Sequence, residues 1–300
     1  MTPAAGPGLA LLASGGDFFE SPRWHDGRWF VSDVYGGVVY AVGDGGELIR
    51  IAGVAGRPSG LGWLSDGTML VVSMRDRHVL AIRDPGAADP HLEVYADLSG
   101  WCRYDLNDML VVDDRVLVGT VGFELGAKVL AQPGSVYEVA VDGSNRELAG
   151  ELWCPNGIVK VPGTQTFVVA ESFGARLTAF DDEGGRWTRR RALYAEGDQP
   201  GDPGWTPRAM PRFVPDGLAV DHLGGVWVAD PRNRRCIRVT TQGGVDREIR
   251  ADEAVYACAI GGPSGETLLL CTAPGPAQVL AGERVRSRLL TTAARAEQTG

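Results

Sequence analysis

Two short stretches of the sequence, CPNGIVKV (154–161) and VPDGLAV (214–220), share a Pro-x-Gly pattern before an apolar run, with Asn156 in one and Asp216 in the other. Both tripeptides are common turn sequences, because Pro presets φ, Asn and Asp tolerate a left-handed backbone, and Gly relieves the next position. Their middle residues differ in chemistry: an amide oxygen can coordinate a cation, whereas a carboxylate can also take up a proton. Whether the two side chains serve one site depends on the elements that carry them.

Short apolar runs recur along the whole chain and predict the strands that would position these residues. Each run has a small residue in fourth place, as close packing between stacked sheets requires, and each follows another strand and a tight turn. A third strand follows each of the first five runs. The runs are WFVSD (29–33), LVVSM (70–74), VLVGT (116–120), FVVAE (167–171), VWVAD (226–230) and LLLCT (268–272). Their ends lie 41 to 59 residues apart, which brackets the roughly 40–50 residues of a β-propeller blade.

The repeat predicts an all-β fold, a single six-bladed β-propeller over residues 1–300. One meander cannot bury both of its faces, so the meanders are expected to stack in a ring. The segment LALLAS (9–14) is expected to complete the last blade, and a β-sandwich would leave the repeat unexplained. The expected blades span approximately residues 18–56, 57–98, 105–143, 152–194, 214–250 and 254–290.

The first strand of each blade lines the central channel, so one position of the repeat can gather residues that are distant in sequence. Counting back 13 to 15 residues from the end of each run gives Glu20, Ser59, Asn107, Asn156, Asp216 and Ala257. Two carboxylates and two amides among them suit a hard divalent cation. Taken singly, Asn156 and Asp216 are more commonly turn residues, and Glu20 is as readily a surface ion-pair partner. Their shared position in the repeat favours a metal site.

Charge and composition argue against several classes of function. The chain has 29 Lys and Arg against 38 Asp and Glu, which gives a net charge of −9 and a pI near 5.0. This charge disfavours nucleic acid and anionic membranes as partners and favours a cation or a small neutral molecule as the ligand. We expect a monomer or a small homo-oligomer. No stretch approaches the roughly 20 apolar residues of a spanning helix, and no secretory signal is evident, so we expect a cytoplasmic protein. The 5 cysteines support neither a disulfide framework nor a Cys/His zinc site.

Two further features lie near the expected channel. A Pro- and Gly-rich stretch at 195–213, which carries Trp205, lengthens the interval before the fifth blade. It is interpreted either as a lid or specificity loop or as an exposed linker. The acids that end three runs, Asp33, Glu171 and Asp230, are expected to cap strands or to pair with Arg.

Four motifs, in order, resemble one family over nearly the whole chain, from about Phe18 to Thr272. They are FFESPRWHDGRWFVSD (18–33), NDMLVVDD (107–114), CPNGIVKVPGTQTFVVAESFGARLTAFD (154–181) and VPDGLAVDHLGGVWVADP (214–231). In this combination the chain resembles the senescence marker protein (regucalcin)/gluconolactonase/luciferin-regenerating enzyme-like family. The resemblance implies a six-bladed propeller that holds one divalent cation in its channel.

By this resemblance, Glu20, Asn156 and Asp216 are metal ligands, and Asp216 is also the expected catalytic base. Asn107 matches a family Asn that lies beside the metal and contacts it or the substrate. Members that act on sugar lactones often carry Arg two positions before that Asn. Here the residue is Asp105, with Arg103 displaced by two positions.

The resulting hypothesis is a gluconolactonase-like hydrolase that depends on a divalent metal and acts on a lactone. Calcium is favoured by the oxygen ligands, with zinc, manganese and magnesium as alternatives. The metal would polarise the carbonyl while Asp216 assists the attack of water, with Asn107 as the second catalytic candidate. Asp108 is another candidate base, and Arg103, Asp108 and Trp205 are weaker candidates for substrate contact. The alternatives are a non-hydrolytic biosynthetic enzyme on the same propeller and a non-enzymatic calcium-binding or docking propeller.

Overall fold

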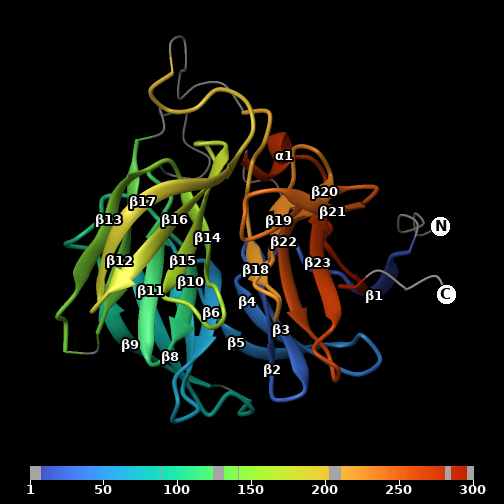
Figure 1. Cartoon of the computed structure of the whole chain (residues 1–300). Coiled ribbons are helices and arrows are strands. Elements are labelled where there is room, and N and C mark those ends of the chain that lie inside the picture. Colours follow the sequence, from blue (N-terminus) through green and yellow to red (C-terminus); the bar gives the residue numbers. More distant parts are fainter. Residues whose placement is uncertain are drawn as a thin grey trace.

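The computed structural model of the chain describes residues 8–88, 90–123, 132–140, 142–202, 211–280 and 285–295. Within these ranges the chain folds into six antiparallel sheets of four strands each. The sheets are arranged around a central axis as the blades of a β-propeller (Figure 1). The predicted all-β, six-bladed fold is therefore confirmed.

The first three blades follow one another along the chain, and each runs in sequence from its inner to its outer strand. Blade 1 consists of β2 (Phe19–His25), β3 (Arg28–Asp33), β4 (Val38–Val42) and β5 (Leu48–Gly53). Blade 2 consists of β6 (Pro58–Trp63), β7 (Met69–Ser73), β8 (His78–Arg83) and β9 (His91–Asp97). Blade 3 consists of β10 (Leu106–Val112), β11 (Arg115–Thr120), β12 (Gly134–Val139) and β13 (Arg146–Leu152).

Blades 4 and 5 repeat this order, and blade 6 is completed by the N-terminal strand. Blade 4 consists of β14 (Pro155–Lys160), β15 (Thr166–Glu171), β16 (Arg176–Glu183) and β17 (Arg186–Ala195). Blade 5 consists of β18 (Leu218–Val220), β19 (Val226–Asp230), β20 (Arg235–Val239) and β21 (Val245–Arg250). Blade 6 consists of β22 (Ala254–Gly261), β23 (Thr267–Ala273), β24 (Arg288–Ala293) and β1 (Ala10–Ser14), with the short helix α1 (Pro276–Leu280) between β23 and β24.

The ring closes where β1 pairs with β24 in an antiparallel ladder that sets Ala10 opposite Thr291. The expectation that LALLAS completes the last blade is confirmed by this pairing. The expected range of the third blade, 105–143, is too short, because it omits β13. Near Asp142 the chain reverses once more, where the Ser144 N–H donates to Asp142 Oδ1 at 2.9 Å, and a fourth strand follows. The range expected for blade 4 therefore begins with the last residue of blade 3.

The core lies between neighbouring blades, where the second strand of each blade is packed on both faces. Five of the small residues in fourth place are fully buried: Ser32, Ser73, Ala170, Ala229 and Cys271. The sixth is Gly119, where an added Cβ would lie 3.0 Å from the carbonyl oxygen of Pro155 in the next blade. Only small residues fit at this depth, because protein interiors are close-packed and a larger side chain would force the blades apart.

The first strands of five blades each carry a one-residue β-bulge near the channel. The register shifts lie between Glu20 and Arg23, Pro58 and Leu61, Leu106 and Met109, Pro155 and Ile158, and Val255 and Ala257. In blade 5, the Ala229 carbonyl accepts a hydrogen bond from the Asp216 N–H, and the Ala229 N–H donates to the Gly217 carbonyl. Asp216 and Gly217 together therefore lie opposite Ala229, as the residues of a bulge do. A bulge interrupts the alternation of side chains along a strand and re-aims the residue within it.

The two Pro-x-Gly stretches are therefore not turns, which corrects the sequence interpretation. Asn156 lies within β14, and Asp216 lies in an extended segment just before β18. Neither Gly157 nor Gly217 has a positive φ. An added Cβ at Gly157 would lie 2.4 Å from the Leu218 backbone nitrogen, and one at Gly217 would lie 2.7 Å from the Ala257 Cα. These glycines are required because adjacent first strands approach each other closely at the channel.

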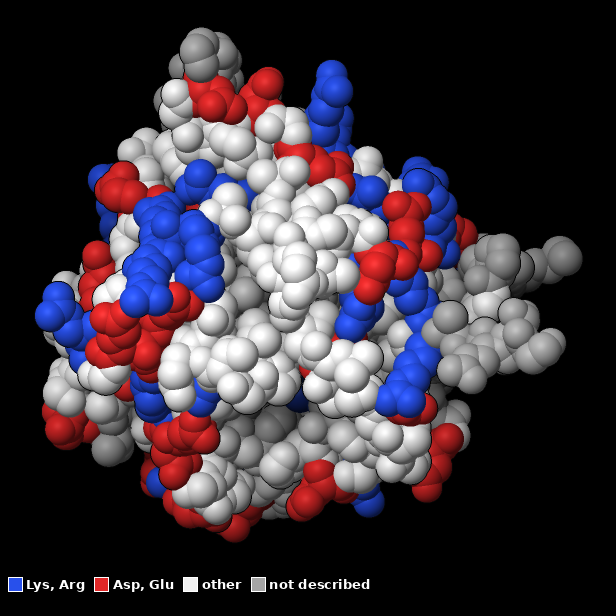
Figure 2. Space-filling view, in the orientation of Figure 1, with Lys and Arg blue, Asp and Glu red and all other residues white. Residues whose placement is uncertain are grey.

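Charged side chains of both signs are interspersed over the face of the molecule seen in Figure 2, around an uncharged central area. Among the residues that the structure describes, no helix has the length and apolar character needed to cross a bilayer.

We predict that Gly157→Ala destabilises the protein by about 1–3 kcal/mol, because the added methyl group overlaps backbone of the neighbouring blade. Gly100→Ala is the control, since a Cβ there meets no atom within 4 Å and the residue has no positive φ. Chemical denaturation followed by circular dichroism measures both variants. Equal stability of Gly157→Ala and the parent chain would contradict the inter-blade contact.

Candidate functional site

A cavity of about 750 Å³, including its solvent-filled mouth, lies where the first strands meet around the axis. Five of the six residues that share one position in the repeat line it: Glu20, Ser59, Asn107, Asn156 and Asp216. The sixth, Ala257, does not, and Tyr256 lines the cavity instead. Val255 faces Thr272 just as Leu106 faces Thr120, so the bulge places Tyr256 at the position that Asn107 has in blade 3.

The amide groups of the two asparagines are held by hydrogen bonds across blade boundaries. Asn107 Nδ2 donates to the Pro155 carbonyl at 3.2 Å. Asn156 Nδ2 donates to Asp216 Oδ1 and, at 3.3 Å, to Ser172 Oγ, and Ser172 Oγ donates to the Pro215 carbonyl at 2.7 Å. Asn156 thereby uses both of its N–H groups and Asn107 one of its two, and the amide oxygens of both residues can still accept or coordinate a ligand.

Buried acids fix the backbone that precedes three of the site residues. The Phe18 N–H donates to Asp33 Oδ1 at 2.9 Å, and the Trp153 N–H donates to Glu171 Oε2 at 2.8 Å. In blade 5, Asp230 is fully buried and its Oδ1 accepts from the Val214 N–H at 3.3 Å. Each bonded N–H lies two or three residues before Glu20, Asn156 or Asp216. The same three blades thus carry both the buried acid and a proposed metal ligand.

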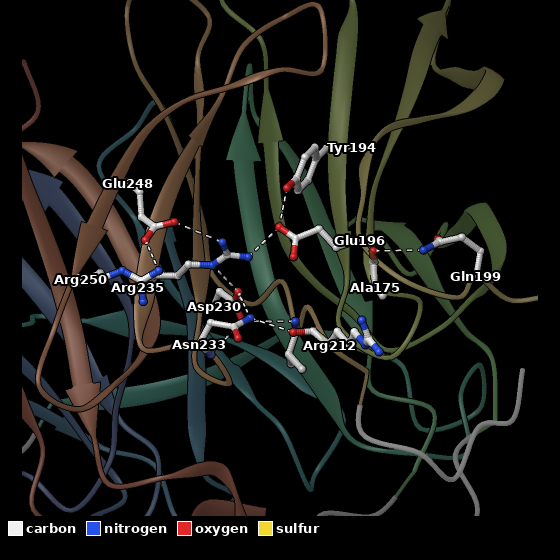
Figure 3. Close-up of polar contacts among 11 residues, drawn as sticks. Ala175, Tyr194, Glu196, Gln199, Arg212, Asp230, Asn233, Arg235, Glu248 and Arg250 are labelled. Carbon is white, nitrogen blue, oxygen red and sulfur yellow. Dashed lines mark hydrogen bonds and ion pairs between the residues drawn. The ribbon is translucent and has the colours of Figure 1, made fainter.

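In blade 5 the buried acid belongs to a wider ionic network (Figure 3). Arg235 lies between three carboxylates and contacts Asp230 at 2.8 Å, Glu196 at 2.7 Å and Glu248 at 3.3 Å. Asn233 Nδ2 donates to Asp230 Oδ2 at 2.7 Å and to the Arg212 carbonyl at 2.8 Å. The network therefore fixes the backbone that leads into Asp216. The expectation that Glu171 and Asp230 pair with Arg is confirmed, since Arg176 contacts Glu171 at 2.8 Å.

The cavity holds two carboxyl groups with no basic side chain in the described lining to balance their ionisation. Its described lining contains the carboxylates of Glu20 and Asp216 and no Lys, Arg or His. Burial and the nearby Asp108 raise the pKa of Glu20 from 4.5 to about 8. Burial, Glu20 and Asp108 raise the pKa of Asp216 well above its usual value of 3.8. Two buried carboxyls of like charge disfavour joint ionisation, and a bound cation would relieve that cost.

Asp108 faces away from the cavity despite its place next to Asn107. It is buried, its Oδ1 accepts from Arg23 Nη2 at 2.7 Å and from Ser21 Oγ at 3.2 Å, and it does not line the cavity. Asn107 and Asp108 are the two residues of the bulge between Leu106 and Met109, and the bulge aims their side chains in different directions. The negative charge of Asp108 nevertheless contributes to the raised pKa values of Glu20 and Asp216.

The other two candidates for substrate contact also lie outside the cavity lining that the structure describes. Arg103 is exposed, with its guanidinium 5.5 Å from the centroid of the Tyr104 ring. Trp205 lies outside the described residues, as does much of the 195–213 stretch. Val214, which follows that stretch, lines the cavity.

The donor set fits a hard divalent cation in type, with two carboxylates and two amide oxygens converging from four blades. The described residues contain no cluster of three or more His, Cys, Asp or Glu side chains that could hold a metal. A metal at this site would therefore depend on the amides, and on water, to complete its coordination.

The aromatic lining of the cavity is the part that sequence reasoning missed. Its members are Phe18, Tyr35, Phe123, Phe173 and Tyr256. The repeat does indicate which positions line the cavity, although not that they are aromatic. Phe18, Cys154 and Val214 each lie two residues before Glu20, Asn156 or Asp216, and all three line the cavity. The residues that immediately follow the apolar runs also line it, among them Val34, Val121, Ser172 and Pro231.

Comparison with known proteins places the chain in a family. Residues 18–274 match the model of the SMP-30/Gluconolactonase/LRE-like region, and the chain belongs to this family. The resemblance noted from its four motifs is thereby confirmed. No curated protein matches the chain.

Solved structures share the fold at low sequence identity. A gluconolactonase from Xanthomonas campestris superposes with a TM-score of 0.73 at 20% identity, covering 95% of this chain and 89% of that one. A luciferin-regenerating enzyme gives a TM-score of 0.77 at 17% identity, covering 96% and 95% of the two chains. Regucalcin from Agrobacterium tumefaciens, described as a calcium-binding protein, gives 0.72 at 19% identity and covers 95% and 94%.

We predict that the metal-free protein loses stability as the pH rises. The folded state holds a proton on Glu20 up to about pH 8, whereas the unfolded chain releases it near pH 4.5. The stabilising contribution is complete below about pH 4.5 and is lost as the pH rises through about 8, and the raised pKa of Asp216 acts with the same sign. Thermal unfolding in EDTA is expected to show Tm falling by several degrees between about pH 5 and pH 8.

Glu20→Gln is the comparison for this measurement. It removes the titrating group and one of the two repelling charges, so its Tm should depend less on pH. The same pH dependence in the variant and the parent chain would contradict the assignment.

Proposed function

We propose that the protein is a lactonase that depends on a divalent cation, with calcium the favoured ion. The proposal is carried by one observation: two carboxyl groups, of the partly buried Glu20 and the buried Asp216, and two amides line a single cavity whose described lining contains no basic side chain. Membership of the SMP-30/Gluconolactonase/LRE-like family supports the reaction class.

In this proposal Glu20, Asn156 and Asp216 hold the cation, and Asn107 contributes its amide oxygen to the cation or to the substrate. Asn156 is positioned by its hydrogen bonds to Asp216 and Ser172, and Asn107 by its bond to the Pro155 carbonyl at 3.2 Å. When bound, a divalent cation supplies polarisation of the lactone carbonyl and stabilises the negative charge that develops on its oxygen, an effect worth several kcal/mol.

Asp216 is the proposed base. Its Oδ1 accepts from Asn156 Nδ2. In this proposal the second lone pair of Oδ1 would serve the cation, and Oδ2 takes a proton from the attacking water. The water oxygen bonds to the carbonyl carbon, the ring C–O bond breaks, and the proton passes to the released alkoxide oxygen, so the product is a hydroxy acid. General-base assistance of this kind typically contributes about 10²–10⁴-fold to the rate.

We predict that Asp216→Asn reduces lactone turnover by at least about 10²-fold, because the amide cannot take up a proton. The substitution preserves the shape of the side chain, so the fold is expected to survive. A screen of lactones with a pH indicator identifies a substrate, and a pH-stat assay with calcium present then gives kcat. Asp44→Asn is the control, because Asp44 is an exposed residue that does not line the cavity. Full turnover by Asp216→Asn, with calcium chelated, would refute the mechanism.

We predict that Glu20→Gln weakens calcium binding by roughly tenfold or more, because the site loses one of its two anionic ligands. Isothermal titration calorimetry of the chelator-treated protein with calcium alone measures the change. Glu47→Gln, at an exposed position outside the cavity lining, is expected to bind calcium as the parent chain does. Calcium binding without turnover of any lactone would favour a calcium-binding propeller or a non-hydrolytic enzyme over the lactonase.

A further inference from the structure

Much of the cavity lining is aromatic and differs in chemistry from the carboxyl groups of Glu20 and Asp216. Phe18 packs against Tyr35 with ring centroids 5.4 Å apart and meets Tyr256 edge-on at 4.9 Å. From blades 3 and 4, Phe123 and Phe173 pair with their centroids 5.3 Å apart. Both groups line the same cavity, and Val, Met and Pro side chains make up much of the remaining described lining. The polar groups of the proposed reaction site are therefore flanked by aromatic surface.

The hydroxyl groups of Tyr35 and Tyr256 have no free hydrogen-bond donor to offer a ligand. The Tyr35 hydroxyl donates to the Val279 carbonyl, and the Tyr256 hydroxyl donates to the Pro274 carbonyl at 2.7 Å. Both phenolic protons are thus engaged by backbone carbonyls. What remains for a ligand is chiefly the surface of the rings, which binds apolar and aromatic groups.

Several other polar side chains of the lining also direct hydrogen-bond donors to the protein itself. Asn107 Nδ2 donates to the Pro155 carbonyl, Asn156 Nδ2 to Asp216, and Ser172 Oγ to the Pro215 carbonyl. The described lining offers no Lys, Arg, His or Gln. Ligand hydroxyl groups that lie against the aromatic and apolar walls would be left unpaired on burial, at a cost of about 1–3 kcal/mol each.

We infer that the substrate is a lactone with an apolar substituent of alkyl or aryl type, and not a polyhydroxylated sugar lactone. The inference rests on the proposed lactonase function and specifies the substrate class of that site. The lactone carbonyl lies among Glu20, Asn107, Asn156 and Asp216, and the substituent lies against the aromatic walls. The four polar side chains and the aromatic walls line the same cavity, so one ligand can contact both.

Three δ-lactones that share one ring size test the inference with the parent chain in calcium-containing buffer. They are unsubstituted δ-valerolactone, a δ-lactone with a pentyl chain on the ring carbon that bears the ring oxygen, and D-glucono-1,5-lactone. We expect kcat/KM for the pentyl lactone to exceed that for δ-valerolactone by at least about tenfold, because each buried methylene contributes roughly 0.8 kcal/mol. D-Glucono-1,5-lactone is expected to fall below both. A higher kcat/KM for the sugar lactone than for the pentyl lactone overturns the inference.

A binding measurement separates the substrate class from the reaction. The corresponding lactams are not readily hydrolysed, so calorimetry with the pentyl lactam and the sugar lactam reports recognition alone. Binding of the pentyl lactam, without turnover of any lactone, supports the recognition of apolar ligands and refutes the proposed hydrolysis. Tighter binding of the sugar lactam overturns the inference whatever the activity.

Phe173→Ala tests the wall directly. Loss of the ring is expected to lower the ratio of kcat/KM for the pentyl lactone to that for δ-valerolactone by at least about fivefold, a ratio that general destabilisation of the fold does not move. Val94→Ala is the control, because Val94 is an apolar residue 56% exposed on the outer surface. An unchanged ratio in Phe173→Ala, with a parent-like circular dichroism spectrum, counts against the aromatic wall as the substituent site.

Discussion

The pairing of β1 with β24 is the interaction on which the site depends, because the site exists only while the ring is closed. Its residues come from separate blades, and their distances are set by the angles between blades and not by any local segment of chain. The closing ladder joins Ala10 to Thr291, near the two ends of the described chain. The entropic cost of closing so long a loop grows only with the logarithm of its length, so one antiparallel ladder and the packing of the last blade can hold the ring. Loosening this ladder would separate the carboxylates and amides from one another, although only Glu20 lies near it in sequence.

Closure brings together groups that repel each other, and the surrounding structure resists that repulsion. Glu20 and Asp216 face one cavity; Glu20 raises the pKa of Asp216, and Asp108 raises the pKa of both. The backbone ahead of Glu20, Asn156 and Asp216 is held by Asp33, Glu171 and Asp230, which accept hydrogen bonds from main-chain N–H groups. Bulges in the first strands then aim the site residues at the channel. Hydrogen bonds thus hold the backbone beside the proposed ligand site, and a bound cation would relieve the electrostatic cost of bringing the two carboxyls together.

The fold and much of the candidate site could be predicted from the sequence because both follow from a period. A repeat of apolar runs determines the blades, and one position within the repeat gathers Glu20, Asn107, Asn156 and Asp216 in a single cavity. The errors arose where structure departs from the period. The bulge of blade 6 places Tyr256 instead of Ala257 at the channel. Pro-Asn-Gly and Pro-Asp-Gly resemble turns, yet Gly157 and Gly217 serve inter-blade contact, which composition alone does not reveal. Asp108 is next to Asn107 in sequence but lies on the other side of the strand, bonded to Arg23. Contacts between blades are long-range, and no local pattern encodes them.

The bulge in each first strand has a consequence for how such a protein can change over evolutionary time. The residue at the channel lies within the bulge, and its backbone is held by its neighbours, so the strand ladder is largely independent of which side chain it carries. Glu, Asn, Asp and Tyr already occupy this position in different blades of one ring. A propeller of this kind can therefore alter its chemistry by point substitution at a few positions while its scaffold stays constant. Each blade contributes a separately variable group, and the number of combinations grows multiplicatively with the number of blades.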